Sequence, residues 1–573
     1  MSRGKPPFPP DRCTFSPNRP FQVLKAFFIC YIPLRAQVAQ RPDCVIDPSF
    51  RVKSAPFMNE NRRVTKAAGI IGTATLLSRI LGFIRDMLIA WFFGAGLITD
   101  AFFVAFRIPN LLRRLFAEGT LSIVFVPVFT DYLAREGREE AFRMARSAVR
   151  MLSVILVILT IAGIAGAPLI VRAIAPGFDG PHFHTTVLLT RIMFPYMFFI
   201  CLVALAMGIL NVLGHFTAPA FSPVLLNLAI IGSVLFLSPR MTSPVNGLAI
   251  GVLLGGMLQL ALQIPFMIRK GFYFWQSARI YHPGLKRIGK LMGPAVLGAA
   301  AYQINILVST LLASMLPEGS VSYLYYADRL IQFPLGLFAI STSVAVLPSL
   351  SRQAAARDFK GLGDTFAFSI GMISFITLPS MIGLIVLREP IVAVIFGRGA
   401  FGAEDIRMTA HALLFYGVGL WAFSAVRIVV AAFYAIQDTR TPVRAANISI
   451  AANVVLGMAL MGPLGHGGLA LATSIASLIN LGLLSLALRR KLGIFPWKKI
   501  VVSISKSMIS SLIMGVFLLW WIHRIPSIGC GMTPDLIFHV IYAIIVGIVI
   551  YSMSALVLQR NEFKAVIALV NRH

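Results

Sequence analysis

The residues best suited to chemistry in this sequence are charged side chains that interrupt an apolar stretch, residues 79–118. The stretch contains five arginines and three acids: Arg79, Arg85, Asp86, Asp100, Arg107, Arg113, Arg114 and Glu118. An ionisable side chain at membrane depth costs about 2.5–3.5 kcal/mol on insertion scales, so such residues normally face a bundle interior or a water-filled cavity. Because the arginines outnumber the acids, we predict a cationic cavity suited to an anionic substrate.

A second charged pair, Asp328 and Arg329, lies in the apolar segment LYYADRLIQFPLG. Pro334 follows in the same segment and predicts a break in its helix, because proline lacks an amide donor and disrupts the preceding turn. Pro109 predicts a similar break in the first stretch. On a helical wheel, four polar residues of the first stretch fall within about 80° and form one stripe: Arg107, Asn110, Arg114 and Glu118.

Guanidinium groups are planar, permanently charged and bidentate, so an anionic phosphate head group is the ligand that these arginines fit best. We predict that Arg79, Arg85 and Arg329, which lie in mid-span, line the cavity. The acids Asp86, Asp100, Glu118 and Asp328 all lie near arginines, which favours ion pairing or gating. For Arg114 and Asp100, near span ends, snorkelling or an ion pair that fixes helix packing is an equally good reading.

The composition indicates a polytopic membrane protein. Of the 573 residues, 57% are hydrophobic and 13% are charged, and the mean hydropathy is +0.82. The net charge of +29 is spread through loops between apolar segments rather than gathered in a basic domain, which argues against nucleic acid as a partner. Anionic membrane lipids attract such juxtamembrane charges by about 1 kcal/mol each and account for much of the surplus.

The sequence argues against an enzyme. It contains no DxD, HExxH, GxSxG or P-loop motif, and its intramembrane acids adjoin arginines instead of a metal or nucleophile. The five cysteines show no CxxC and no metal-ligand spacing, so we expect neither a metal site nor a disulfide framework. No cofactor is expected.

Apolar stretches of about 20 residues recur from residue 66 and predict an all-α membrane protein with about fourteen transmembrane helices. The predicted spans are 66–93, 97–128, 146–175, 185–212, 218–238, 246–268, 287–315, 320–350, 364–387, 406–435, 441–462, 467–489, 500–522 and 535–558. Lys and Arg concentrate in alternate loops, which predicts that both termini are cytoplasmic.

The chain also repeats itself weakly at a spacing near 222 residues, as in Ala105-Phe106-Arg107 and Ala327-Asp328-Arg329. Six spans per period predict a parallel repeat of two six-helix lobes, a recurrent transporter design. The predicted domains are an N-lobe at 58–283, a C-lobe at 284–492, and spans 13 and 14 with a tail at 493–573. Residues 1–57 are basic and proline-rich, and we expect a disordered extension or an artefact of an upstream start codon.

Several motifs resemble those of the MurJ (MviN) family of lipid II flippases, in the MOP exporter superfamily. The motifs are LSRILGFIRD, TDAFFVAFRIPNLLRRLFAEG, FVPVF, APGF, YYADRLIQFP and QDTRTPV. The resemblance covers about residues 60–560. It implies a multi-pass protein of the bacterial inner membrane that moves lipid II, undecaprenyl-diphosphate bearing the disaccharide-pentapeptide of peptidoglycan, to the outer leaflet by alternating access.

The resemblance also implies roles for individual residues. The central-cavity arginines of the family match Arg79, Arg85, Arg113 and Arg329, and the family's acids in the first two spans match Asp86, Asp100 and Glu118. One position departs from the pattern: some members carry an acid where this chain has Gln332, so a carboxylate role there is in doubt. Spans 7 and 11 contain no Asp or Glu, so we identify no sodium site.

Several alternatives stay open at this point. Another MOP-type exporter, either a polysaccharide-repeat flippase or a cation-coupled drug exporter, is the second reading, although a cationic drug would favour carboxylates in the cavity. A structural scaffold for the cell-wall synthesis machinery is a third. The energy source is also open between the membrane potential and a sodium or proton gradient.

Overall fold

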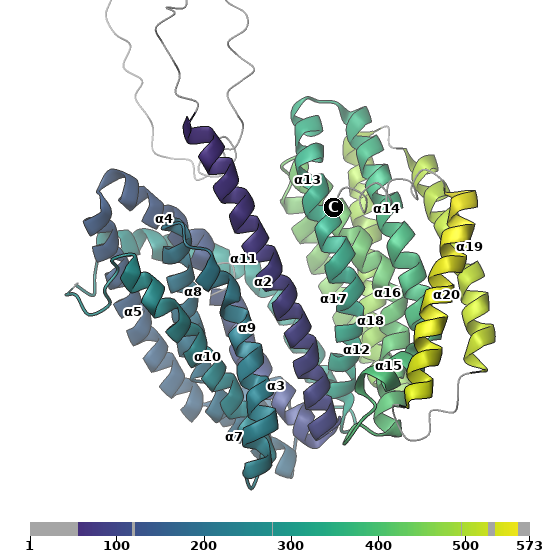
Figure 1. Cartoon of the computed structure of the whole chain (residues 1–573), viewed down its shortest axis with the longest axis horizontal. Coiled ribbons are helices and arrows are strands. Elements are labelled where there is room, and N and C mark those ends of the chain that lie inside the picture. Colours follow the sequence, from purple (N-terminus) through teal and green to yellow (C-terminus); the bar gives the residue numbers. More distant parts are fainter. Residues whose placement is uncertain (1–54, 117–120, 278, 494–495, 525–532, 560–573) are drawn as a thin grey trace, which may run out of the picture. The chain divides into compact units, whose positions relative to one another are not determined.

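The computed structural model describes residues 55–116, 121–277, 279–493, 496–524 and 533–559, with the side chains of 55–68, 115–116, 122–123 and 294–302 left aside. Residues 65–573 form one compact unit (Figure 1). Most of the predicted N-terminal extension, and Glu118, lie outside the described residues.

The first half of the described chain consists of helices joined by short turns (Figure 1). They are α2 (Ala55–Phe93), α3 (Leu97–Phe116), α4 (Ser122–Arg135), α5 (Arg138–Ala165), α6 (Ala167–Ile174), α7 (Gly180–Met193), α8 (Tyr196–Val212), α9 (Thr217–Gly232), a π-helical turn η2 (Ser233–Leu237), a short 3-10 turn η3 (Ser238–Arg240) and α10 (Pro244–Arg269). Within this half, α10 packs against α8 and α9, and α5 packs against α4 and α8.

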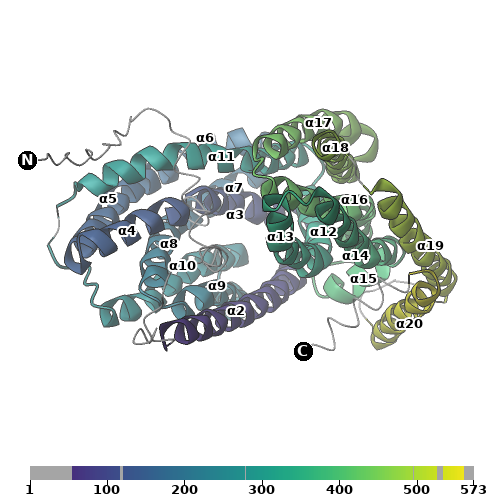
Figure 2. The ribbon, with the colours of Figure 1, turned by 90° about the horizontal axis from the view of Figure 1, so that it is seen from above.

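The second half is built in the same way (Figure 2). It contains α11 (Pro283–Ser314), α12 (Ser320–Pro334), the π-helical turn η4 (Leu335–Ala339), α13 (Ile340–Ala355), α14 (Phe359–Val386), α15 (Arg388–Phe396), α16 (Ala403–Ala435), α17 (Arg440–Leu464), α18 (His466–Leu492), α19 (Trp497–Ile522) and α20 (Pro534–Leu558). Helix α16 packs against α12, α13, α14 and α18, while α19 and α20 pack together beside α14.

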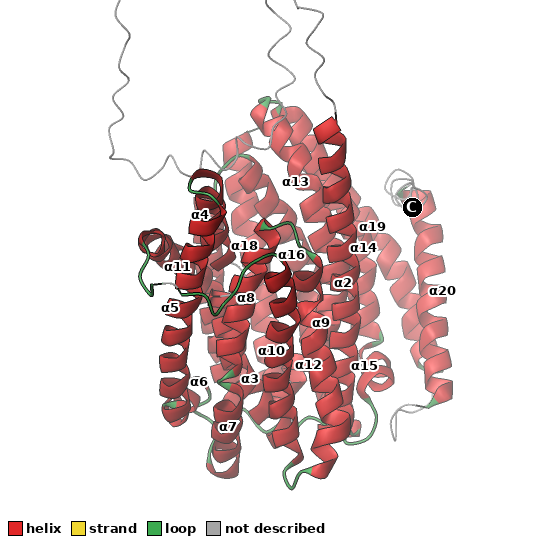
Figure 3. Cartoon of the chain, turned by 60° about the vertical axis from the view of Figure 1, so that its left-hand side comes forward, coloured by secondary structure: helices red, strands yellow, loops and turns green. Residues whose placement is uncertain are grey.

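The all-helical architecture confirms the predicted fold class, and no strand occurs among the described residues (Figure 3). Within that part of the chain, eleven helical stretches are long and apolar enough to cross a membrane. The other three predicted spans also coincide with helices: 66–93 with α2, 97–128 with α3 and α4, and 287–315 with α11. These helices are more charged, or are described only in part, and so are not among the eleven. The lobe boundaries stay a prediction.

The two predicted proline breaks have different outcomes. Pro334 ends α12, and the π-helical turn η4 follows directly, so the helix changes type at the predicted position, although the helical stretch continues from Ser320 to Ala355. The break predicted at Pro109 is wrong, because this proline lies inside α3, which continues to Phe116. One helix was not predicted: α15 occupies a segment that the sequence indicated only as a loop containing arginines.

The buried core differs between the two ends of the bundle. At one end, a single cluster joins residues from both halves of the chain, including Phe103 of α3, Tyr326 of α12 and Phe396 of α15. At the other end each half has its own cluster, one around Phe129 and one around Phe433. The halves are therefore packed together at one end and packed separately at the other.

Candidate functional site

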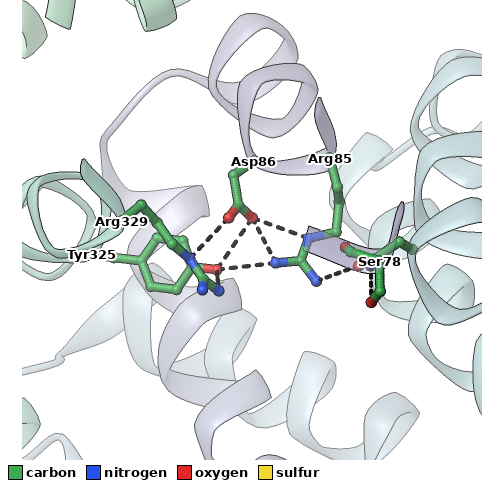
Figure 4. A network of polar contacts seen from close by, with 6 residues as sticks. Ser78, Arg85, Asp86, Tyr325 and Arg329 are labelled. Carbon is green, nitrogen blue, oxygen red and sulfur yellow. Dashed lines mark hydrogen bonds and ion pairs between the residues drawn. The ribbon is translucent and has the colours of Figure 1, made fainter. Parts of the chain in front are cut away.

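A network of two arginines, one aspartate and one tyrosine joins α2 to α12 (Figure 4). Arg85 binds Asp86 through Nε and Nη2, at 3.0 and 2.7 Å from Oδ1. Arg329 forms an ion pair with the other oxygen of Asp86, with Nε 2.9 Å from Oδ2. Tyr325, one turn before Arg329, donates from its hydroxyl to Asp86 Oδ1 at 3.2 Å. One carboxylate thus holds two guanidinium groups from distant parts of the sequence.

Tyr325 also holds both arginines directly. Its hydroxyl oxygen accepts hydrogen bonds from Arg329 Nη2 at 2.6 Å and from Arg85 Nη2 at 3.3 Å. The guanidinium of Arg329 lies over the Tyr325 ring, with 4.8 Å from Cζ to the ring centroid, a cation–π arrangement. These contacts fix the orientation of Arg329, so its charge is positioned before any ligand arrives.

Asn227 of α9 extends the network into the first half of the chain. Its Oδ1 accepts a hydrogen bond from Arg85 Nη1 at 3.1 Å, and its Nδ2 donates to the Ser78 carbonyl at 2.9 Å. This close approach of α9 to α2 occurs beside Gly82, where an added Cβ would lie 3.6 Å from Asn227 Nδ2. The Asn227 amide that orients Arg85 thus packs directly against α2 at this glycine.

Burial makes the charge balance of this network important. Asp86 is 1% exposed and Arg85 is 7% exposed, while the Arg329 side chain is 32% exposed. Two guanidinium groups and one carboxylate leave a net positive charge where water is largely excluded, and electrostatic interactions are strongest in such an environment. The arrangement can bind an anion through the exposed part of Arg329, and because the side chains are already ordered, binding needs little further loss of conformational entropy.

Arg79 lies six residues before Arg85 on α2, about 9 Å along a helix. It is exposed, and its guanidinium approaches the backbone of the π-helical turn η4. A Cβ added at Gly336 would lie 2.5 Å from Arg79 Nη1, so the glycine permits this approach. The structure thus brings Arg79, Arg85 and Arg329 to neighbouring parts of α2, α12 and η4.

The other predicted residues have different partners. Arg113 binds Asn110, one turn earlier on α3, through Nε at 3.0 Å and Nη2 at 2.7 Å. Arg107 donates to the Thr310 hydroxyl of α11 rather than to any residue of the network. Asp328 accepts a hydrogen bond from Gln332 and lies within electrostatic range of Arg107, Arg114 and Arg329.

Asp100 joins α3 to the start of α12. It is 1% exposed, and its Oδ2 accepts from the Gly319 amide at 2.8 Å while its Oδ1 accepts from the Ser322 amide at 2.8 Å. The Ser322 hydroxyl donates to the same Oδ1. A carboxylate at a helix N-terminus satisfies otherwise unpaired amides and interacts favourably with the helix dipole. Asp100 therefore acts as a cap supplied from another helix.

Further contacts close the same end of the bundle. The Ala400 amide donates to the Trp91 carbonyl at 2.9 Å, which connects the end of α2 to the turn before α16. The Tyr323 hydroxyl donates to Asp405 at 3.2 Å. The helices of the two halves are consequently bound to each other at the end where α2 ends and where α12 and α16 begin.

Sequence reasoning missed Tyr325, Asn227 and Thr310. Tyr325 precedes Arg329 by four residues, so the two share a helix face, and that spacing could have identified it. Asn227 is an amide inside an apolar predicted span, which is itself a signal. Thr310 gave no comparable signal, because threonine hydroxyls commonly bond to the helix backbone, as this one also does to Ile306.

Comparison with known proteins identifies the family. The profile of the family described as "Lipid II flippase MurJ" matches residues 89–538. The chain belongs to the MurJ family. A probable lipid II flippase MurJ of Vibrio cholerae is 39% identical over 80% of this chain and 89% of the relative, and a lipid II flippase MurJ of Burkholderia cenocepacia is 38% identical over 74% and 83%.

The fold comparison agrees with this assignment to the MurJ family. A solved structure titled "Lipid II flippase MurJ, inward closed conformation" has a TM-score of 0.73 and 29% identity, covering 86% of this chain and 99% of that one. An inward-facing multidrug MATE transporter of the MOP superfamily has a TM-score of 0.62 at 16% identity, over 73% of this chain and 94% of that one. The second likeness shows a shared fold alone. The chain is therefore a transporter rather than an enzyme.

Proposed function

We propose that this protein moves lipid II from the cytoplasmic to the outer leaflet of the bacterial inner membrane, with both of its own termini in the cytoplasm. Membership of the MurJ family supports the substrate, since curated relatives of 35–39% identity carry that function in their names. The observation that carries the proposal is the buried, net positive network of Arg85, Asp86 and Arg329, which suits a diphosphate.

Arg79, Arg85, Arg113 and Arg329 bind the diphosphate in this proposal. Arg79 is exposed and makes the first contact. Arg329 offers its partly exposed guanidinium deeper along the helices, already oriented by Tyr325. Arg85 is too buried to meet the lipid first, so it supports the positive potential and responds when Asp86 exchanges partners.

The transport step is alternating access between two arrangements of the lobes. The contacts of Asp100 with α12 and of Trp91 with Ala400 hold one end closed, while the halves are packed separately at the other end. A bound diphosphate competes with Asp86 for the guanidinium of Arg329. We propose that this competition loosens the joint between α2 and α12 and permits the closed end to open.

The membrane potential can supply energy for this step without ATP. Each net negative charge moved outward across the full field gains about 2.3 kcal/mol per 100 mV. A sodium or proton gradient resetting the empty carrier is the other source compatible with the proposal. The cell-wall synthesis machinery is the expected consumer of the exported lipid.

Conservative replacement of Arg329 tests the role of the network. Arg329→Lys retains the charge but loses the planar fork and its position over Tyr325, whereas Arg329→Ala loses both. If the protein uses this arginine for transport, Arg329→Lys should support only poor growth of cells depleted of their own lipid II flippase, and Arg329→Ala should support none. Survival with either variant at wild-type rates would instead indicate a scaffold.

A further inference from the structure

A second concentration of positive charge lies away from the central network, where α5 begins and where the chain passes from α10 to α11. Residues 138–150 and 269–290 together contain ten Lys and Arg but two Glu. Figure 2 places α5 on the opposite side of α8 and α10 from the helices that follow α12. This basic surface therefore cannot be part of the Arg85 and Arg329 network.

The segment between α10 and α11 is held against α5 by polar contacts. Arg138 donates to the Lys270 carbonyl, Arg150 Nη2 donates to the Gln276 carbonyl at 2.8 Å, Ser147 donates to the Arg279 carbonyl at 2.6 Å, and His282 Nε2 lies 2.9 Å from Glu140 Oε1. Two contacts from the first turn of α5 and two from around Ser147 and Arg150 fix this segment along the helix. The positive side chains are therefore prearranged.

Arg146 lies at the centre of this arrangement and forms no ion pair among the described residues. It is 7% exposed, its Nη1 donates to the Gln276 side-chain oxygen, and its Nε has no hydrogen-bond partner. Among the described residues no carboxylate forms an ion pair with it. Glu139, seven residues earlier and on the same helix face, lies within electrostatic range of Arg146 but forms no ion pair with it. Glu140 is already bound by Arg143 at 2.7 Å and by His282. A buried guanidinium that forms no ion pair is costly and attracts an anion.

The surrounding side chains place Arg146 at the level of lipid head groups. Large exposed apolar residues of α5 begin at Val154, two turns further along, where the helix enters hydrocarbon. On the other side, Trp275 and Tyr281 are 67% and 66% exposed. Exposed aromatic residues beside basic ones are typical of the membrane–water interface. The unpaired guanidinium thus lies where phosphates of the bilayer are found.

We propose that Arg146 and Arg150 bind the phosphodiester of an anionic phospholipid, held between α5 and the segment that precedes α11. This site is separate from the substrate cavity and does not depend on the proposed function. Guanidinium groups match phosphate oxygens in geometry, and basic pockets between transmembrane helices on the cytoplasmic side recognise anionic head groups. The bound lipid supplies the ion-pair partner that Arg146 lacks among the described residues.

The same phosphate chemistry is present in two membrane lipids, a bulk anionic phospholipid and lipid II itself. The wild-type protein and its variants are purified in a neutral detergent and titrated separately with phosphatidylglycerol and with lipid II, and bound lipid is counted by native mass spectrometry. Arg146→Gln removes the charge, and Arg146→Lys keeps it without the fork. Gln276→Ala removes the side chain that holds Arg146, and Arg352→Gln removes an exposed arginine of α13.

We expect Arg146→Gln to weaken phosphatidylglycerol binding at least tenfold and Arg146→Lys to weaken it three- to tenfold. Gln276→Ala and Arg352→Gln should stay within threefold of wild type, and lipid II binding should be unchanged by Arg146→Gln. A thermal unfolding scan of each variant checks the fold, and Arg146→Lys decides the question if Arg146→Gln does not fold.

Three results would overturn the proposal. The first is unchanged phosphatidylglycerol binding by folded Arg146→Gln, or by Arg146→Lys if only that variant folds. The second is an equal loss of phosphatidylglycerol binding in Gln276→Ala, which would indicate that the lost binding comes from detachment of the segment from α5 and not from the charge of Arg146. The third is a selective loss of lipid II binding in Arg146→Gln, which would assign this surface to the substrate.

Discussion

Asp100→Asn should shift the protein toward the arrangement in which the closed end is open. The carboxylate accepts the Gly319 amide on Oδ2, and the Ser322 amide and hydroxyl on Oδ1. An asparagine has one acceptor oxygen, so its NH2 group would face an amide donor. The substitution therefore removes at least one hydrogen bond to a charged group and the interaction of that charge with the N-terminus of α12.

The size of the effect follows from these two losses. A hydrogen bond to a charged group contributes about 1.5–3 kcal/mol, and a charge at a helix terminus contributes about 0.3–1 kcal/mol. Together they amount to about 2–4 kcal/mol in favour of the closed end. Since about 1.4 kcal/mol corresponds to a factor of ten, the closed-to-open ratio should fall by roughly 30- to 1000-fold.

Cysteine labelling at the closed end can measure this shift. Ser320 is 3% exposed, so Ser320→Cys, in a background without the five native cysteines, should react slowly with a membrane-impermeant maleimide. Adding Asp100→Asn should raise the labelling rate in proportion to the open population. Asp535→Asn is the matched control, because Asp535 lies in the first turn of α20 and is exposed. Equal labelling with and without Asp100→Asn would show that Asp100 does not hold this end closed.

Three further predictions concern other residues. Asp86→Asn should lower the free energy of unfolding by about 3–5 kcal/mol in denaturant or thermal unfolding, because it leaves two guanidinium groups without their carboxylate. Tyr325→Phe should lower it by only about 1 kcal/mol. Equal effects of the two variants would contradict the central position of Asp86 in the network. Gly336→Ala should displace Arg79 and weaken lipid II binding in a folded protein. Gly462→Ala is the control, because nothing lies close to that glycine, and it should leave binding unchanged. Unchanged binding by Gly336→Ala would show that Arg79 does not contribute to the binding site. In the turn before α17, burial opposes ionisation, but hydrogen bonds from Lys491 and Thr441 outweigh it and hold the pKa of Asp438 at about 2. Because this folded pKa lies below the usual value, wild type should be about 2 kcal/mol more stable than Asp438→Asn at neutral pH and lose that advantage as the pH falls from 4 toward 2.

The helices of this protein could be predicted because each span is a long apolar run. Such a run can be recognised from the local sequence alone, without knowing which helices pack against it. Pro334 was informative for a local reason, since proline lacks an amide donor and disturbs the preceding turn, but the same rule failed at Pro109, which α3 accommodates. Helix α15 was not predicted because it is short and charged at its start.

The partners of the charged residues were harder to predict than their positions. The excess of arginine over acid indicated a cationic site, and Arg85, Asp86 and Arg329 do lie together. The repeat placed Arg107 and Arg329 at matching positions of the two halves, yet their partners differ: Arg107 bonds to Thr310 of α11, whereas Arg329 pairs with Asp86. A helical wheel gives the face of one helix but not which helix lies opposite.

Asp100 shows the same limit. The sequence left its role open between snorkelling and an ion pair, and the structure instead gives it backbone amides of α12 as partners. No pattern within α3 could reveal this, since the amides belong to a segment more than two hundred residues away. The types of residue in the sequence predicted where charge is concentrated. The partner of each charged residue depends on tertiary packing, which the sequence pattern does not reveal.

The most direct test of the account is the accessibility of lipid II at the cell surface to an added, membrane-impermeant probe. Cells depleted of their native flippase are complemented with this protein or with Arg85→Ala, and expression and folding of the variant are verified. We expect the wild type to restore exposure of lipid II and Arg85→Ala to abolish it. A correctly inserted wild-type protein that restores no exposure would contradict lipid II transport by this chain.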